Sequence, residues 1–147
     1  MIGIITNYRV AANIPVTSSV VLVDATGLSF DLAASQIVRV ESRLFFSVGA
    51  TGGARAQLIV PAGGTLFFQS NTVVNVVADT VLYSTQAASA AVTDAFANAG
   101  THWMDIQADI INGATAGTMK FQFAQNTSDA LTMNLVIGSW MRVTVLQ

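Results

Sequence analysis

Few side chains in this sequence could do acid–base, nucleophilic or metal chemistry. There is one histidine, His102, and it stands beside Trp103 where an alternating segment begins, so we interpret it as a packed or surface residue. There is no cysteine, which excludes a disulfide framework and a thiolate metal site. A jelly-roll metal enzyme of the cupin kind needs several ligands, and a single histidine argues against it. We therefore predict a protein that is not an enzyme and has no metal or cofactor.

The eight acidic residues also form no catalytic pair. Asp105 and Asp109 are predicted on one strand face, about 13 Å apart at about 3.3 Å per residue. A glycosidase pair needs about 5 to 9.5 Å. A hairpin turn at 112–117 would place Asp109 nearly opposite Lys120, and a cross-strand ion pair would then explain both residues. The glycines at 49–53 and 113–117 lie between strands, which indicates hairpin loops and not phosphate-binding loops.

Two tryptophans, Trp103 and Trp140, remain as candidates for ligand chemistry. Together they could form a platform on which a sugar ring stacks. Tryptophans in β-sandwiches more often pack in the core or in an interface. Carbohydrate is therefore the less favoured partner.

The composition favours a protein whose surface contacts other protein. The chain has 147 residues, which fits one domain. Charged residues make up 10%, against about 25% in ordinary soluble domains, and Lys120 is the only lysine. Depletion of charge is typical of the cores of permanent interfaces. We therefore favour an assembled protein over a monomer kept soluble by serine and threonine.

Other partners are disfavoured by charge and hydropathy. The net charge is −2 and the arginines are scattered, which argues against nucleic acid as a partner. No segment reaches the roughly 18 apolar residues of a membrane helix, and residues 1–5 lack the basic region of a signal peptide. We predict no membrane partner and synthesis in a cytoplasm.

Period-two alternation predicts that β-strands position nearly all of these residues. In the segment Ile37–Phe46, apolar side chains occupy one face and the arginines and the glutamate the other. Turn residues separate the strand segments at regular intervals, which predicts about eight to ten antiparallel strands in a jelly-roll β-sandwich over residues 16–147. The segments from which these strands are expected are Val20–Asp24, Leu28–Leu32, Ile37–Phe46, Ala54–Val60, Trp103–Ile111, Thr118–Phe123, Leu131–Ile137 and Trp140–Leu146, together with the β-rich segments Thr65–Ser70, Thr72–Ala78 and Thr80–Thr85.

Two segments depart from this alternation. The alanine-rich segment Ala87–Ala99 could form a short helix or a long crossover loop between sheets. Residues 1–15 form an apolar N-terminal arm that either adds an edge strand to its own sheet or reaches a neighbouring molecule. We favour the neighbour, because a free apolar arm would promote aggregation. The apolar residues of this arm are Ile2, Ile4, Ile5, Tyr8, Val10 and Ile14.

The predicted outward faces carry large apolar side chains among very few charges. An isolated sandwich should avoid such faces, whereas an assembled one can use them. The candidate interface residues on these faces are Ile37, Phe45, Ile59, Trp103 and Trp140.

Several strand-and-turn motifs resemble those of structural proteins of tailed bacteriophages. The run Val20–Phe30 resembles a recurrent opening of these proteins, two strands with D-x-T-G-L-S-F between them. The second half is similar to their ending, I-x-G…G-T-h-x-h-x-h-A-Q…G-S-h-h-R-V, where h is apolar; it is carried here by Ile111–Gly113, Gly117–Gln125 and Gly138–Val143. The resemblance covers residues 18–147 and implies a jelly-roll module.

Such modules occur as capsid decoration (cement) proteins and as domains of tail or fibre proteins, often as trimers. The chain appears as a lone module with a short arm, which favours decoration. The resemblance thus implies a homotrimer that binds the major capsid protein and stabilises the phage head. Its place would be the virion surface, after synthesis in the cytoplasm of a bacterial host. The alternative is a receptor- or carbohydrate-binding domain of a tail or fibre.

Overall fold

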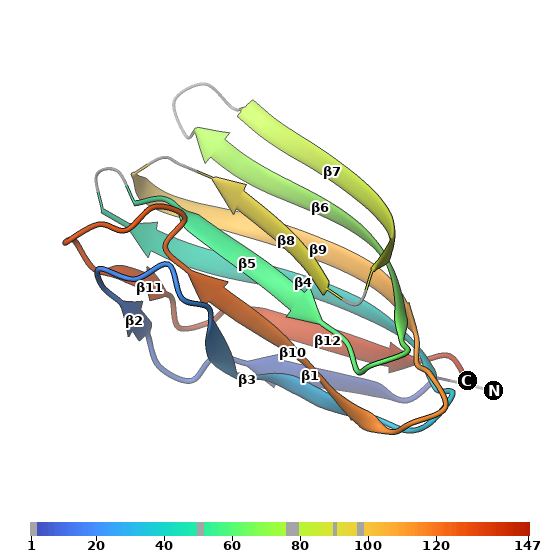
Figure 1. The fold of residues 1–147 in the computed structure, drawn as a ribbon. Coiled ribbons are helices and arrows are strands. Elements are labelled where there is room, and N and C mark those ends of the chain that lie inside the picture. The colour runs from blue at the N-terminus through green and yellow to red at the C-terminus, as the bar shows by residue number, and fades with distance from the viewer. Residues whose placement is uncertain (1–2, 50–51, 76–79, 90, 97–98) are drawn as a thin grey trace.

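The computed structural model describes residues 3–49, 52–75, 80–89, 91–96 and 99–147, and throughout them the regular structure is β. Two antiparallel sheets pack face to face (Figure 1). This all-β sandwich is the fold class that the alternation predicts. The large sheet contains β1 (Ile5–Arg9), β12 (Trp140–Val145), β4 (Ile37–Val48), β9 (Gly100–Ile111), β6 (Thr65–Asn75) and β7 (Thr80–Ser89) in that order. In the same sheet β11 (Met133–Leu135) also pairs with β4, and β2 (Ile14–Val16) pairs with β11. The small sheet contains β3 (Val23–Leu32), β10 (Gly117–Ala124), β5 (Ala54–Ile59) and β8 (Ala91–Phe96).

The order of the strands is that of a jelly roll. Four nested antiparallel pairs, β1 with β12, β3 with β10, β4 with β9 and β5 with β8, are the pairs of one long hairpin. The hairpin is rolled up so that successive pairs fall alternately in the large and the small sheet. The β6–β7 hairpin is inserted between β5 and β8 and widens the large sheet beyond β9 (Figure 1). Because the hairpin is rolled up, the first strand, β1, pairs with the last strand, β12.

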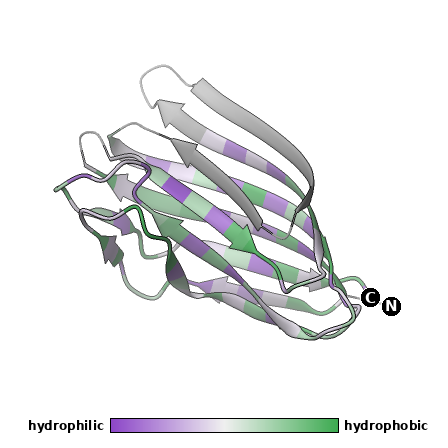
Figure 2. Ribbon diagram, in the orientation of Figure 1, coloured by the Kyte–Doolittle hydropathy of each residue, from purple (hydrophilic) through white to green (hydrophobic). Residues whose placement is uncertain are grey.

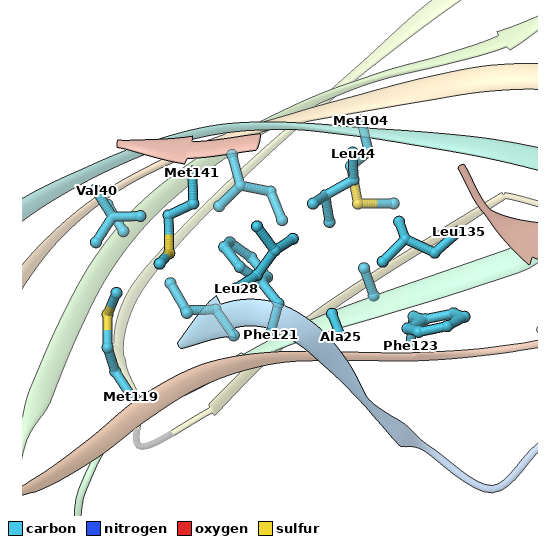
Figure 3. Close-up of a cluster of buried hydrophobic side chains, with 14 of the residues drawn as sticks. Ala25, Leu28, Val40, Leu44, Met104, Met119, Phe121, Phe123, Leu135 and Met141 are labelled. Atoms are coloured by element: carbon cyan, nitrogen blue, oxygen red, sulfur yellow. The ribbon is translucent and has the colours of Figure 1, made fainter. Parts of the chain in front are cut away.

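The core lies between the two sheets and is formed by the alternate residues that the sequence pattern selects. In β4, the inward side chains of Val38, Val40, Leu44 and Phe46 are at most 1% exposed. Apolar and polar residues alternate along the described strands (Figure 2). In the close-up, side chains from the two sheets meet, among them those of Leu28, Met119 and Met141 (Figure 3). Burial of these inward faces is the main contribution to stability.

One predicted turn is part of a strand. Ala25-Thr26-Gly27 was expected to separate two strands, but β3 runs unbroken through it. A bulge absorbs the turn residues: Lys120 is opposite Ser29, while Gln122 is already opposite Asp24. Gly27 has a φ of 91°, and a Cβ added there would lie 2.7 Å from the carbonyl oxygen of Arg9. Glycine is needed because of this close approach as well as the conformation.

The two glycine-rich segments that were predicted as hairpin loops connect strands of different sheets. The segment 112–117 leads from β9 in the large sheet to β10 in the small sheet, and 49–53 leads from β4 to β5 in the same way. The predicted ion pair between Asp109 and Lys120 is therefore wrong. Asp109 binds Arg39 on β4, and Lys120 binds Asp24 on β3. Alternation sets the two faces of each strand but does not specify which strand is its neighbour.

The prediction of a helix in the alanine-rich segment is also wrong. Ala87 lies in β7 and Ala91–Phe96 forms β8, which pairs with β5 along its whole length. The alternative, a crossover, is closer to the structure, because β7 belongs to the large sheet and β8 to the small one. Backbone pairing with β5 outweighs the helical preference of alanine.

Three buried polar residues of the phage-like motifs organise loops. Gln125 accepts hydrogen bonds from the backbone of Ser19 and Asp129 and donates to two carbonyl groups. Asn112 donates to the carbonyl oxygens of Ala33 and Thr115 at the β9–β10 crossover. Ser139 accepts a hydrogen bond from the backbone N–H of Phe45, on β4, just before β12 begins. Through these hydrogen bonds the three residues stabilise the jelly-roll connections.

The N-terminal segment is largely part of the sandwich. β1 pairs with β12 from Ile5 opposite Thr144 to Arg9 opposite Trp140, so of the two predicted alternatives the structure has the edge strand in its own sheet. Ile14 follows in β2, opposite Leu135 of β11, and Val10 is 2% exposed. The strands β1 and β2 within residues 5–16 thus belong to this chain's own large sheet, and not to a separate arm that precedes the sandwich. The physical reason is that β12 offers an unpaired edge within reach of the chain itself.

Candidate functional site: the outward face of the large sheet

The predicted site residues fall into two groups. Of the N-terminal set, Ile2 lies outside the described residues, Ile4 and Ile5 are 70% and 58% exposed, and Tyr8 packs edge-to-face on Phe30 with ring centroids 6.1 Å apart. Of the predicted interface set, four residues share the outward face of the large sheet, whereas Ile59 lies on the outward face of the small sheet. The four are Ile37, Phe45, Trp103 and Trp140.

Three of these side chains gather around one arginine. Phe45 and Trp103 are cross-strand partners on β4 and β9, and Trp140 on β12 is the partner of Arg43. The Arg43 guanidinium stacks over the Trp103 ring, 4.5 Å from its centroid. We call Phe45, Trp103, Trp140 and Arg43 the aromatic band. All four are partly exposed, so the band places large side chains at the surface of the sheet.

Arg43 is held in place from its other side by Asp105. The carboxylate accepts hydrogen bonds from Nε at 2.7 Å and Nη2 at 2.6 Å, and the aspartate side chain is only 24% exposed. This bidentate pair fixes the plane of the guanidinium. Because one face of the Trp103 ring is covered by Arg43, the predicted stacking of a sugar on this tryptophan is disfavoured.

A ladder of paired charges continues from the band along the same face. Arg39 donates to Asp109 from Nε and Nη2 at 2.7 and 2.9 Å, and Arg142 lies 3.6 Å from Glu41. The hydrogen bonds from Arg39 hold the pKa of Asp109 below its ordinary value of 3.8. Arg39 and Arg142 are each paired with a carboxylate, so the ladder adds no net charge to this part of the face.

The far end of this face is apolar. Ile37 and Ile111 are cross-strand partners, and the backbone of Leu146 donates to the Ile37 carbonyl oxygen at 2.8 Å. Ile111 and Leu146 are 44% and 50% exposed. Sequence reasoning named neither as a surface residue, because it placed neither of these strand-end residues on a face. Alternation alone puts Ile111 with Asp109, and Leu146 with Thr144, on the outward face. We call Ile37, Ile111 and Leu146 the apolar end.

Sequence reasoning also missed Phe67, which is 45% exposed beside Asp109. It is followed by Phe68, which is 6% exposed, and two adjacent phenylalanines give alternation no signal about which one points outward. The sequence does contain a hint, because Thr65 and Gln69, which share the parity of Phe67, are polar, and Leu66, which shares the parity of Phe68, is apolar.

The lone histidine lies inside the sandwich. His102 is 2% exposed, and its Nε2 lies 2.8 Å from the carbonyl oxygen of Ala99. Of the two interpretations made from the sequence, the packed residue is the observed one. Among the described residues no three His, Asp or Glu side chains are placed to hold a metal ion together. In that same part of the chain no helix is long and apolar enough to cross a membrane.

The comparisons with known proteins do not assign this chain to a family. No protein-family model matches the chain, and no curated protein matches it. Solved structures with some similarity include one of the infectious bursal disease virus Gt strain, 10% identical, covering 97% of this chain and 41% of that chain with a TM-score of 0.25. A second is the VP2 subviral particle of the same virus, 12% identical, covering 97% and 40% of the two chains with a TM-score of 0.27. The chain thus spans about two fifths of these virus proteins, and its fold assignment rests on its own strand order.

Proposed function

We propose that this chain is a non-enzymatic structural protein of a bacteriophage particle, a homotrimeric decoration protein that binds the major capsid protein and stabilises the head. Its place would be the outer surface of the capsid. The single observation that carries the proposal is the aromatic band, which leaves partly exposed tryptophans on a rigid sheet with a fixed arginine among them.

The composition of this face supports contact with protein. Aromatic residues and arginine are enriched in the cores of interfaces and lysine is depleted, and tryptophan and arginine are frequent hot spots. Four of the five arginines, Arg9, Arg39, Arg43 and Arg142, belong to strands of the large sheet, while the single lysine lies in the small sheet. A self-association surface fits this pattern better than a solvated face.

The phage assignment is supported by the motifs in residues 18–147. Their buried polar residues stabilise the jelly-roll connections, so the motifs support a module of this type. These buried residues do not contribute to the surface that would contact a partner. A cement protein acts by burying area across neighbouring subunits, at about 25 cal/mol per Å² of apolar surface before the cost of association. The apolar end supplies such area at the opposite end of the face from the band.

Two measurements test the proposal. We expect the purified protein to have three times the mass of one chain by light scattering. We also expect quantitative mass spectrometry of purified particles to find hundreds of copies. A monomer would overturn the trimer, and about a dozen copies or fewer would place the chain in the tail, as the receptor-binding alternative requires.

A further inference from the structure

A shallow groove of about 450 Å³ crosses β4, β9 and β6 on the outward face of the large sheet. Two rows of cross-strand partners form it. The first row contains Arg39, Asp109 and Phe67, and the second contains Glu41, Gln107 and Gln69.

The groove combines an exposed ring with fixed polar groups. Phe67 is 45% exposed, so one apolar ring lies open on a sheet that holds it rigidly. Gln69 and Gln107 are direct cross-strand partners and both are exposed. Each carboxamide offers two donors and an acceptor, and Glu41 and Asp109 add carboxylate acceptors beside them. An aromatic face next to convergent donors and acceptors matches a ligand with apolar C–H faces and many hydroxyl groups.

The charge of the groove selects among such ligands. Nε and Nη2 of Arg39 donate hydrogen bonds to the carboxylate of Asp109 at 2.7 and 2.9 Å. Nη1 of Arg142 lies 3.6 Å from the carboxylate of Glu41. Among the described residues, Arg39, which lines the groove, and the neighbouring Arg142 are therefore each paired with a carboxylate, which disfavours them as sites for an anionic group. An acidic ligand would lie beside Glu41 and Asp109 and would have to compete with them for Arg142 and Arg39.

From these contacts we propose that the groove binds a neutral oligosaccharide. Phe67 stacks on the C–H face of one sugar ring, and Gln69 and Gln107 bind the hydroxyl groups of that ring and the next. The site differs from a platform built on the two tryptophans, because Trp103 is covered by Arg43 while Phe67 is open.

The proposal goes beyond the proposed function and does not depend on it. The second row of the groove, with Glu41 and Gln107, lies two residues along β4 and β9 from Arg43 and Asp105, about 7 Å at about 3.3 Å per residue. Contacts between copies at the band can therefore leave the groove open to a glycan.

The test uses the full chain on an array of neutral gluco-, galacto- and manno-oligosaccharides together with sialylated and sulfated glycans. Calorimetric titration of the best array ligand then measures affinity. We expect binding to neutral members, with Phe67→Ala and Gln107→Ala each weakening it at least tenfold. Gln57→Ala, a glutamine on the outward face of the small sheet, is the matched control and should change it less than twofold.

Circular dichroism confirms that each variant is folded, and light scattering on the same samples reports the oligomeric state separately. Absence of binding to any neutral glycan, preference for the acidic glycans, or equal affinity of the Phe67→Ala and Gln107→Ala variants and the unmodified chain would each overturn the proposal. A monomeric chain that still binds neutral glycans would contradict the proposed trimer but not the proposed glycan site in the groove.

Discussion

The two outward faces of the sandwich differ in kind although the same alternation generates both. The face of the large sheet carries the aromatic band, the matched charge ladder and the apolar end. The face of the small sheet carries short polar groups: Asp24 accepts hydrogen bonds from Lys120 and Gln122, and Asp31 accepts one from Thr118. Aromatic and arginine side chains can bury much area per residue, whereas this second network is exposed and already satisfied. This difference is the reason we propose that copies associate through the aromatic band of the large sheet, while the face of the small sheet stays in water.

The largest expected effect comes from removing the edge of the large sheet. Deletion of residues 1–10 eliminates β1 and the packed side chains of Tyr8 and Val10. At about 1.5–3 kcal/mol for each buried side chain, we expect a loss of about 3–6 kcal/mol in the free energy of unfolding, measured by urea denaturation. Deletion of residues 1–3 leaves β1 intact and should cost less than about 1 kcal/mol. Equal stability of the two shortened chains would show that β1 is dispensable to the sheet.

The aromatic band gives the sharpest test of the two faces. Trp103→Ala should weaken association between copies by about 2 kcal/mol, roughly thirtyfold, because a central tryptophan is a typical hot spot. Ile59→Ala on the small sheet is the control and should change it less than threefold. Analytical ultracentrifugation measures both. If Ile59→Ala weakens association more than Trp103→Ala does, copies associate through the face of the small sheet and not through the aromatic band.

A smaller effect is expected from Arg43→Lys. Lysine keeps the charge but loses the bidentate contact with Asp105 and most of the stacking on Trp103. Because the arginine side chain is 40% exposed, we expect a loss of only about 1 kcal/mol in folding stability. Arg142→Lys, whose contact with Glu41 is 3.6 Å, should cost less than about half of that. Thermal denaturation of the two variants compares them, and equal losses would contradict a special role for Arg43.

The smallest effect is a loss of stability in acid, to which each face contributes one aspartate. Hydrogen bonds from Lys120 and Gln122 lower the pKa of Asp24, and those from Arg39 lower that of Asp109, below the ordinary value of 3.8. The unfolded chain then binds protons before the folded one does, so stability is fully present above about pH 4 to 5 and falls as the pH drops through the folded pKa values.

Because both carboxylates are largely exposed, each contributes less than about 1 kcal/mol. Denaturation midpoints between pH 2 and 6 should therefore depend less on pH in Asp24→Asn and Asp109→Asn than in the unmodified chain. A pH dependence unchanged in both variants would mean that other carboxylates cause the acid sensitivity.

The sequence by itself determined the class of the fold and the faces of its strands. Val38, Val40, Leu44 and Phe46 are buried as alternation predicts, because a period of two leaves each strand only one way to bury its apolar set. The outward positions of Phe45 and Trp103 follow from the same pattern. The roles of these outward residues in an interface stay predictions.

Only the tertiary structure decided which strands are neighbours. Asp109 faces Arg39 and not Lys120, because the chain crosses between sheets at 112–117. Arg43 reaches Trp103 because β4 pairs with β9, although Arg43 and its partner Asp105 are 62 positions apart in the sequence. Residues 5–9 joined β12, at the other end of the chain, because rolling the hairpin brings the first strand beside the last. Local alternation contains no information about such distant pairing, which depends on how the whole chain closes its sheets. The band and the groove are products of that closure.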